Sequence, residues 1–232
     1  MVTVKLIAPL LILLPSLIYW CIDEKKGLGL SAAFLFSMWV IFFLEYQDVR
    51  LPFEFAANGI ITAVIIGSYF LFAKKIEALF VKGGFRAGMI AAAAVSFLMI
   101  FRLPGEKLLI PGGILLGMGT GFGINCRYIG FRSKHGQLLL KRTVILKYLT
   151  LIIRFLLGAA GFILILFTSG KVIPENSGNV NLYNFIRYAL SGFWVSAAAP
   201  WIFIRLRLAE KEISAAPNTK NEYNDPEEMN DT

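Results

Sequence analysis

Four polar residues in the first half of the chain could together bind a phosphate group: Arg50, Asn58, Arg102 and Lys107. An arginine guanidinium can hold a phosphate through paired hydrogen bonds, and a lysine adds a compact positive charge. The Asn58 amide can both donate and accept. These residues are far apart in sequence, so a site exists only if the fold brings them together. The alternative is that each is an ordinary surface group solvated by water.

The sequence contains little else that could do chemistry. His135 is its one histidine, and it lies between Lys134 and Gly136 in a basic stretch. No local cluster of His, Cys, Asp and Glu has the spacing of metal ligands, and no Gly-rich phosphate loop of the Walker type is present. We therefore name no catalytic residue and expect no metal and no cofactor.

The composition indicates a membrane protein. Hydrophobic residues make up 57% of the chain and charged residues only 16%, against about 25% charged residues in soluble domains. The net charge of +8 would suggest nucleic acid as the partner of a soluble protein. Here the basic residues lie in short links between apolar runs and no nucleic-acid module is visible. We expect membrane lipids as partners and no nucleic acid; protein partners are unknown.

Seven apolar segments predict an all-α transmembrane bundle over residues 1–207, because a bilayer forces each spanning backbone to form its own hydrogen bonds. The segments are Val4–Ile22, Leu28–Tyr46, Phe53–Phe72, Ala87–Phe101, Leu108–Asn125, Leu149–Phe167 and Leu182–Leu206. Residues 208–232 are polar and have no apolar period, which predicts a disordered tail.

The basic residues predict the orientation of the bundle. If the segments alternate in direction, fifteen lysines and arginines fall in links on one side and five on the other. Cytoplasmic links carry the excess of positive charge. The N-terminus is therefore expected outside, the C-terminal tail in the cytoplasm, and the protein in a cell membrane, most simply a bacterial inner membrane. Arg50, Asn58, Arg102 and Lys107 would all lie at the outer side.

The fifth segment is rich in glycine. Gly113, Gly117 and Gly121 are spaced by four residues, a spacing that lets helix backbones approach closely. This predicts tight packing, with residues 91–94, all alanine, as a facing surface. The alternative is a pore or a flexible gate.

Lys147 and Arg154 are seven residues apart and therefore share one helical face. We expect an amphipathic helix at the cytoplasmic surface that then bends into the sixth span. The alternative is that Lys147 reaches the interface from within the span. An intramembrane Arg154 would need a partner.

Residues 15–135 resemble the type 2 phosphatidic acid phosphatase superfamily, which includes bacterial lipid phosphatases. Ile22–Leu30, followed by an apolar helix and Arg50–Phe53, is similar to the run into the motif K-x6-R-P. Ala57–Ala63 lies where the motif P-S-G-H would open its helix. Phe101–Gly105 and Pro111–Gly117 resemble the motif S-R-x5-H-x3-D and the Gly-rich helix after it. The resemblance implies a helical bundle with an outward-facing phosphate site.

The first two motifs depart from the family pattern at the residues that carry its chemistry. In the family one histidine attacks the phosphate, a second protonates the leaving group, an aspartate orients the nucleophile, and Lys and Arg hold the phosphate. Leu44 and Leu51 stand where Lys and Arg of the first motif belong, and only Pro52 is kept. The histidine of the second motif falls at or near Asn58.

The third motif keeps Arg102, has Leu109 near the aspartate position, and has no histidine between them. His135 cannot substitute, because it is predicted on the opposite side of the membrane. The resemblance therefore implies a lipid-phosphatase fold without two-histidine chemistry. We expect a non-catalytic membrane protein that binds a lipid or phosphate headgroup at its outer face. The alternatives are a lipid-phosphate phosphatase with an atypical site and a lipid transporter or flippase.

Overall fold

The chain was analysed in a computed structural model, which describes residues 11–48, 54–101, 108–131, 133, 144–172, 180–209 and 211. Within these residues the only β-structure is one isolated antiparallel bridge, Phe131 to Lys211. The elements are α2 (Leu13–Cys21), α3 (Glu24–Tyr46), α4 (Glu54–Phe101), α5 (Leu109–Ile124), η2 (Asn125–Ile129), α7 (Val144–Val172), α8 (Val180–Phe193), η3 (Trp194–Ala198) and α9 (Ala199–Arg205). The predicted all-α class is confirmed.

Three of the described helical stretches are long and apolar enough to cross a bilayer: Glu24–Tyr46, Leu109–Ile129 and Ile145–Thr168. Two shorter apolar stretches, Ala56–Phe72 and Met89–Met99, both belong to α4. The predicted total of seven crossings stays a prediction.

A short turn reverses the chain between α2 and α3. The backbone of Asp23 is extended, and its carboxylate accepts hydrogen bonds from the backbone N–H groups of Lys25 and Lys26 at 3.0 and 3.1 Å. This N-cap satisfies donors that the first turn of α3 would otherwise leave unpaired. A Cβ on Gly27 would lie 2.3 Å from the backbone of Tyr19, so only glycine allows α3 to pack this closely on α2.

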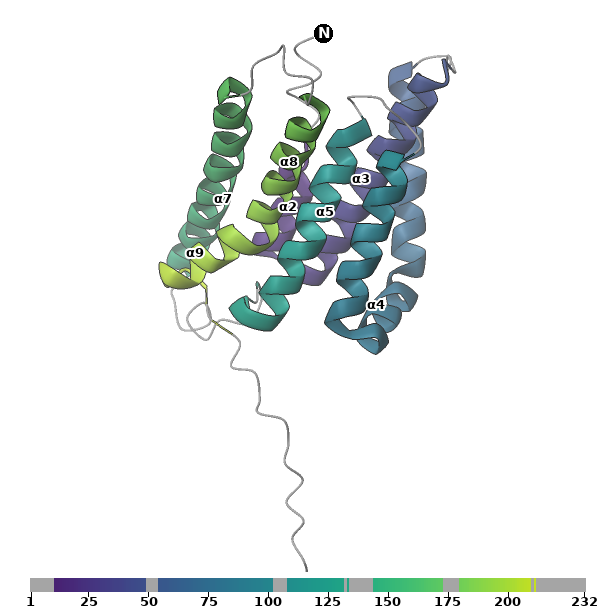
Figure 1. The fold of residues 1–232 in the computed structure, drawn as a ribbon. Helices are drawn as coiled ribbons and strands as arrows, with labels where there is room; N and C mark the ends of the chain where they lie inside the picture. Colours follow the sequence, from purple (N-terminus) through teal and green to yellow (C-terminus); the bar gives the residue numbers. More distant parts are fainter. Residues whose placement is uncertain are drawn as a thin grey trace, which may run out of the picture.

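The ends of the helices gather in two sets (Figure 1). The C-terminal ends of α3 and α7 and the N-terminal ends of α4, α5 and α8 lie at the upper end of the molecule. The C-terminal ends of α2 and α5 and the N-terminal ends of α3 and α7 lie at the lower end, with α9. In the same view α4 descends, folds back at the lower end and rises again. This up-and-down course is the one that alternating apolar segments require.

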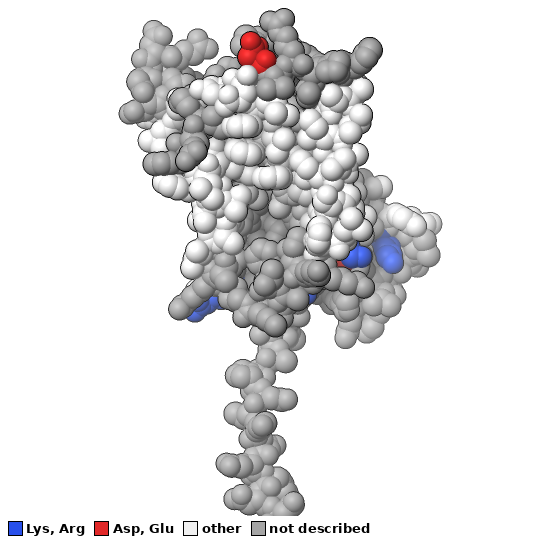
Figure 2. Space-filling view, turned by 90° about the vertical axis from the view of Figure 1, so that its right-hand side faces the viewer, with Lys and Arg blue, Asp and Glu red and all other residues white. Residues whose placement is uncertain are grey.

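Charged side chains are concentrated at the two ends. On the face drawn in Figure 2, the main acidic patch lies at the upper end, basic atoms lie toward the lower end, and the described surface between them is uncharged. Glu45, in the last turn of α3, and Asp48, just after it, lie at the upper end, whereas Lys25, Arg127 and Arg205 belong to the lower end. Such an uncharged belt matches the hydrocarbon layer of a bilayer, and the basic lower end is the one predicted to face the cytoplasm.

Tight packing of α5, predicted from its glycines, is confirmed. A Cβ on Gly117 would lie 1.8 Å from the carbonyl oxygen of Ala189 in α8, and one on Gly113 would lie 2.9 Å from that of Phe185. Gly192 of α8 packs reciprocally on Ile114. The expected facing surface, alanines 91–94, meets a different glycine: Gly119 packs on Ala92. The main glycine face of α5 is therefore directed at α8 rather than at α4.

The amphipathic surface helix expected around Lys147 and Arg154 is not what the described residues form. Both residues belong to α7, a single helix that runs from Val144 to Val172. Lys147 is exposed near the lower end of α7, whereas Arg154 is 1% exposed. The alternative is thus the better description, because a long lysine can reach the interface from inside a span while Arg154 finds its acceptors within the protein.

Candidate functional site

Of the four predicted site residues, only Asn58 is described. It lies about one turn below the start of α4 and is half-buried. Arg50, Arg102 and Lys107 lie outside the described residues, as do His135 and residues 212–232 of the predicted tail. In sequence, Arg102 directly follows the last residue of α4 and Lys107 precedes Leu108. The helix ends next to all three cations lie at the upper end of the bundle (Figure 1).

A buried polar network occupies the lower half of the bundle. The Tyr19 hydroxyl, which is fully buried, donates to the carbonyl of Ser196 at 3.0 Å and accepts from the Asn125 side-chain amide at 3.0 Å. The Asn125 side-chain oxygen accepts from the backbone N–H of Phe131 at 3.0 Å. These bonds join α2, η2 and η3. All three hydrogen bonds join protein groups, so the network fixes the three elements against one another.

A second buried contact closes the same end of the molecule. The Glu24 carboxylate accepts hydrogen bonds from the hydroxyl and the backbone N–H of Ser133, at 2.6 and 3.0 Å, while the Ser133 hydroxyl also lies 3.0 Å from the backbone nitrogen of Glu24. The arrangement resembles a reciprocal helix cap formed by a residue distant in sequence. It ties the segment after η2 to the first turn of α3.

Arg154 connects α7 to both the beginning and the end of the bundle. Its Nε and Nη2 groups donate to the carbonyl of Leu208, with Nε at 2.9 Å, and its Nη1 group donates to the carbonyl of Trp20 at 3.3 Å. Its guanidinium lies 5.9 Å from the centre of the Phe131 ring. A charged group at this depth is expensive unless polar groups surround it. Main-chain carbonyls and an aromatic face meet that need here.

Two π-helical turns, η2 and η3, lie where these contacts converge. In η3 the carbonyl of Val195 accepts from the indole N–H of Trp20 at 2.8 Å, next to the Ser196 carbonyl that accepts from Tyr19. A π-turn shifts the regular hydrogen-bond pattern of a helix, and both of these carbonyls accept from α2. The geometry of η3 is thus matched to two aromatic donors from α2.

Arg187 lies in the upper half of the molecule, on the face of α8 that looks toward α7. Its Nη2 group donates to the carbonyl of Leu166, and its guanidinium lies 5.7 Å from the Tyr188 ring. The Nε atom is buried without a hydrogen-bond partner. Among the residues that the structure describes, no carboxylate pairs with Arg187. Its positive charge is therefore much less satisfied than that of Arg154.

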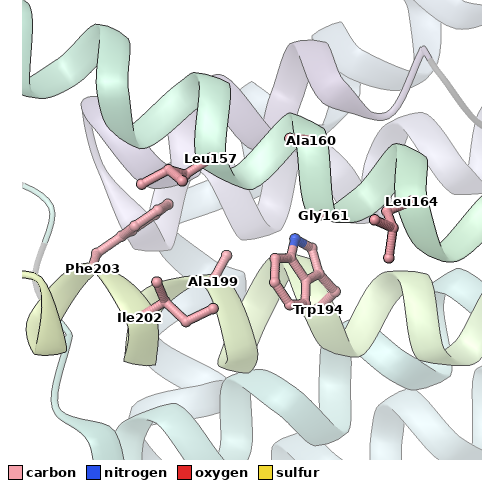
Figure 3. A pocket seen from close by; sticks show the side chains of 8 residues that line it. All are labelled: Leu157, Ala160, Gly161, Leu164, Trp194, Ala199, Ile202 and Phe203. Carbon is pink, nitrogen blue, oxygen red and sulfur yellow. The ribbon is translucent and has the colours of Figure 1, made fainter.

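An apolar groove runs between α7 and the helical run from η3 into α9, below Arg187. Its cavity volume is about 240 Å³. It is lined by Leu157, Ala160, Gly161, Leu164, Trp194, Ala199, Ile202 and Phe203 (Figure 3). The indole N–H of Trp194 donates to the carbonyl of Gly158 at 2.9 Å and holds the ring between the two helices. Leu164 is 62% exposed, so the groove opens onto the outside of the bundle.

The sequence offered only partial signals for these features. Asn125 interrupts an apolar run, and Arg154 and Arg187 are charges inside apolar segments, so each could be singled out by type. Their partners could not be found in this way. Tyr19 and Asn125 are 106 residues apart, and no local pattern relates them.

The comparisons with known proteins give one match. Residues 110–211 match the family described as PAP2 superfamily phosphatase, transmembrane extension. The chain matches no curated protein and no solved structure. The matched residues contain α5, η2, α7, α8, η3 and α9, and they overlap the stretch that resembles the phosphatase motifs only over residues 110–135. Over residues 110–211 the chain is therefore similar to the transmembrane extension of PAP2 superfamily phosphatases, and it has helices long and apolar enough to cross a bilayer.

Proposed function

We propose that this protein is a non-catalytic member of the PAP2 superfamily that binds the phosphate-bearing headgroup of a membrane lipid at its outer face. The family match over residues 110–211 supports a phosphatase-like membrane protein. The finer proposal rests on the residues at the upper end of the bundle.

The chemistry of the chain supports a non-catalytic role. The family's mechanism, as the resemblance implies it, uses two histidines, and this chain has one. Asn58 occupies the position closest to one of the missing histidines. An amide can hydrogen-bond a phosphate, but it does not titrate and cannot protonate the leaving group as a histidine does.

The observation that carries the proposal is the convergence of helix ends at the upper end of the molecule (Figure 1). The end of α3, both ends of α4 and the start of α5 meet there, and these are the ends that flank Arg50, Arg102 and Lys107 in sequence. At the lower end, the buried polar groups are satisfied by protein partners. The upper end is therefore the better candidate for an external phosphate.

Lipid binding and turnover of the purified protein test the proposal. Native mass spectrometry should detect bound phosphatidic acid. Arg102→Gln and Lys107→Gln should each weaken this binding by about tenfold, because each removes a charge-assisted contact. Lys25→Gln, at the opposite end of the bundle, is the matched control and should bind as the unmodified protein does.

Turnover separates the proposal from its rivals. We expect no phosphate release from phosphatidic acid or isoprenyl diphosphates. Release that is abolished by Arg102→Ala would show an enzyme with an atypical site. Scrambling of labelled lipid in proteoliposomes would instead indicate a transporter. Phosphatidic acid binding that is unchanged in Arg102→Gln and Lys107→Gln would remove the outer site.

A further inference from the structure

We propose that the groove between α7 and the run from η3 into α9, together with Arg187 of α8 above it, is a second lipid site, which binds an anionic phospholipid of the leaflet at the upper end, with the phosphate on Arg187 and an acyl chain along Trp194 and Leu164. This site is separate from the cluster of Arg50, Asn58, Arg102 and Lys107, and it is built from residues that the structure describes.

The two faces of α8 have different roles. Phe185, Ala189 and Gly192 pack directly against α5, at distances that exclude any additional atom. Arg187 and Trp194 lie seven residues apart, hence on one face, and both donate to main-chain carbonyls of α7. On this second face, long side chains rather than close backbone contacts connect the helix to α7. The wider spacing leaves room for the groove.

Arg187 is short of acceptors for its charge. A guanidinium carries five N–H donors, and the one side-chain hydrogen bond of Arg187 within the described residues goes to the carbonyl of Leu166. Its Nε is buried and unpaired. A buried unpaired donor on a charged group costs free energy that an anion would recover. Phosphate oxygens suit a guanidinium, which can contact two of them at once.

The groove provides the second half of the site. From Arg187, the α8 face descends about 10 Å to Trp194 at 1.5 Å per residue, and Leu164 lies opposite on α7 (Figure 3). All the lining side chains are apolar except for the indole N–H of Trp194, which is already bonded to Gly158. The groove opens beside Leu164 and Ala160, both exposed, on helices that a bilayer surrounds. A hydrocarbon chain that continues from a phosphate on Arg187 is the occupant that matches both the charge and the apolar lining.

The position of Arg187 selects the leaflet. The helical run of α8, η3 and α9 extends from Val180 to Arg205, and Arg187 is in its upper third. The surrounding side chains Leu182, Ile186 and Leu190 are 57, 45 and 51% exposed, as expected for a lipid-facing surface. A lipid of the opposite leaflet would have its phosphate near Arg205, too far from Arg187 for contact.

Native mass spectrometry of the full chain carrying Arg102→Gln and Lys107→Gln, so that the outer cluster does not contribute, tests the site with dioleoyl phosphatidylglycerol, dioleoyl phosphatidylcholine and glycerol phosphate as probes. We expect a retained phosphatidylglycerol adduct, a weaker phosphatidylcholine adduct and no adduct with glycerol phosphate, which has no acyl chain. Arg187→Gln should reduce the phosphatidylglycerol adduct by about tenfold. Ala160→Trp, which fills the groove and keeps the charge, should abolish the adduct.

The controls separate this site from other basic surfaces. Arg205→Gln removes an exposed arginine that contacts Trp201 at the lower end and should leave the adduct unchanged. Arg187→Lys keeps the charge and should retain most of the binding even if Arg187→Gln folds poorly. The proposal is overturned if Ala160→Trp and Arg187→Gln, folded by their melting curves, keep the adduct. It is also overturned if Arg205→Gln loses the adduct as Arg187→Gln does, or if glycerol phosphate alone binds.

Discussion

At the scale of single residues, two arginines inside apolar helices have opposite environments. Arg154 is almost fully buried and donates to two main-chain carbonyls from distant parts of the chain. Arg187 donates to one and keeps a buried unpaired nitrogen. The same side chain therefore acts as a structural clamp in the first case and is available to an anion in the second.

Replacing Arg154 should destabilise the protein. Arg154→Met leaves the carbonyls of Leu208 and Trp20 without their charged donors, at a cost of about 2–4 kcal/mol. The stability of Arg154→Lys should fall between that of the unmodified protein and that of Arg154→Met, because an ammonium keeps the charge but cannot reproduce the planar fork that spans both carbonyls. Thermal unfolding in detergent measures the effect. Arg205→Met, at an exposed site, is the control, and an Arg154→Met protein that melts at or above the unmodified temperature would contradict the clamp.

At the scale of elements, the close pair of α5 and α8 is the best-packed part of the bundle. Glycines from both helices remove the side chains that would separate the two backbones. Apart from Leu109, the pair lies within the residues that match the transmembrane extension. The packing of α5 on α8 is thus the structural centre of that extension.

A methyl group placed in this interface should force the helices apart. The Cβ of Gly117→Ala would overlap the Ala189 carbonyl, and overpacking of this kind costs about 1–3 kcal/mol. A matched substitution is available in α4, since nothing lies within 4 Å of a Cβ built on Gly67. Gly67→Ala should leave the melting temperature equal or slightly higher, because alanine favours a helix by about 1 kcal/mol over glycine. If both variants melt alike, the close contact does not control stability.

The helices themselves were largely predictable, and the irregular turns were not. Leu28–Tyr46 and Leu149–Phe167 fall within α3 and α7. In a bilayer an apolar run of spanning length forms a helix, because a helix satisfies all its backbone hydrogen bonds internally. The π-turns η2 and η3 bond to α2, more than a hundred residues away in sequence: Asn125 of η2 donates to the Tyr19 hydroxyl, and Ser196 of η3 accepts from it. The surface helix expected at Lys147 was wrong for a related reason: the acceptors that let Arg154 enter the bundle come from residues 20 and 208.

At the scale of the whole molecule, the described charges and the course of the helices fit the orientation predicted from the loop charges. The described basic side chains of η2 and α9 share an end with the turn between α2 and α3, and the acidic side chains after α3 lie at the other (Figures 1 and 2). The sequence predicted this separation through loop charge. It could not place Arg50, Arg102 and Lys107 in a common site, because links of a few residues carry no pattern that fixes where their side chains point.

Thiol labelling should report the two ends in opposite compartments. Cys126 is exposed in η2 at the basic end, so a membrane-impermeant maleimide should modify it in inverted vesicles and not in intact cells. Asp48→Cys, in a background with Cys126→Ser, should show the reverse pattern. Cys21, which is half-buried beside the Leu151 carbonyl, should react slowly from either side and is removed as Cys21→Ala for a clean background. Labelling of both positions from one side would refute the orientation.

The contact between Arg154 and Leu208 sets an order of events during synthesis. The guanidinium belongs to α7, yet its principal acceptor is made 54 residues later. An arginine near the centre of an inserting helix is opposed by about 2.5–3.5 kcal/mol at the translocon. While the ribosome is still producing α8, Arg154 therefore lacks its principal acceptor, and this favours a position of α7 near the headgroups. Full entry of α7 into the bilayer becomes favourable once Leu208 has left the exit tunnel, so the end of the bundle controls the maturation of its middle.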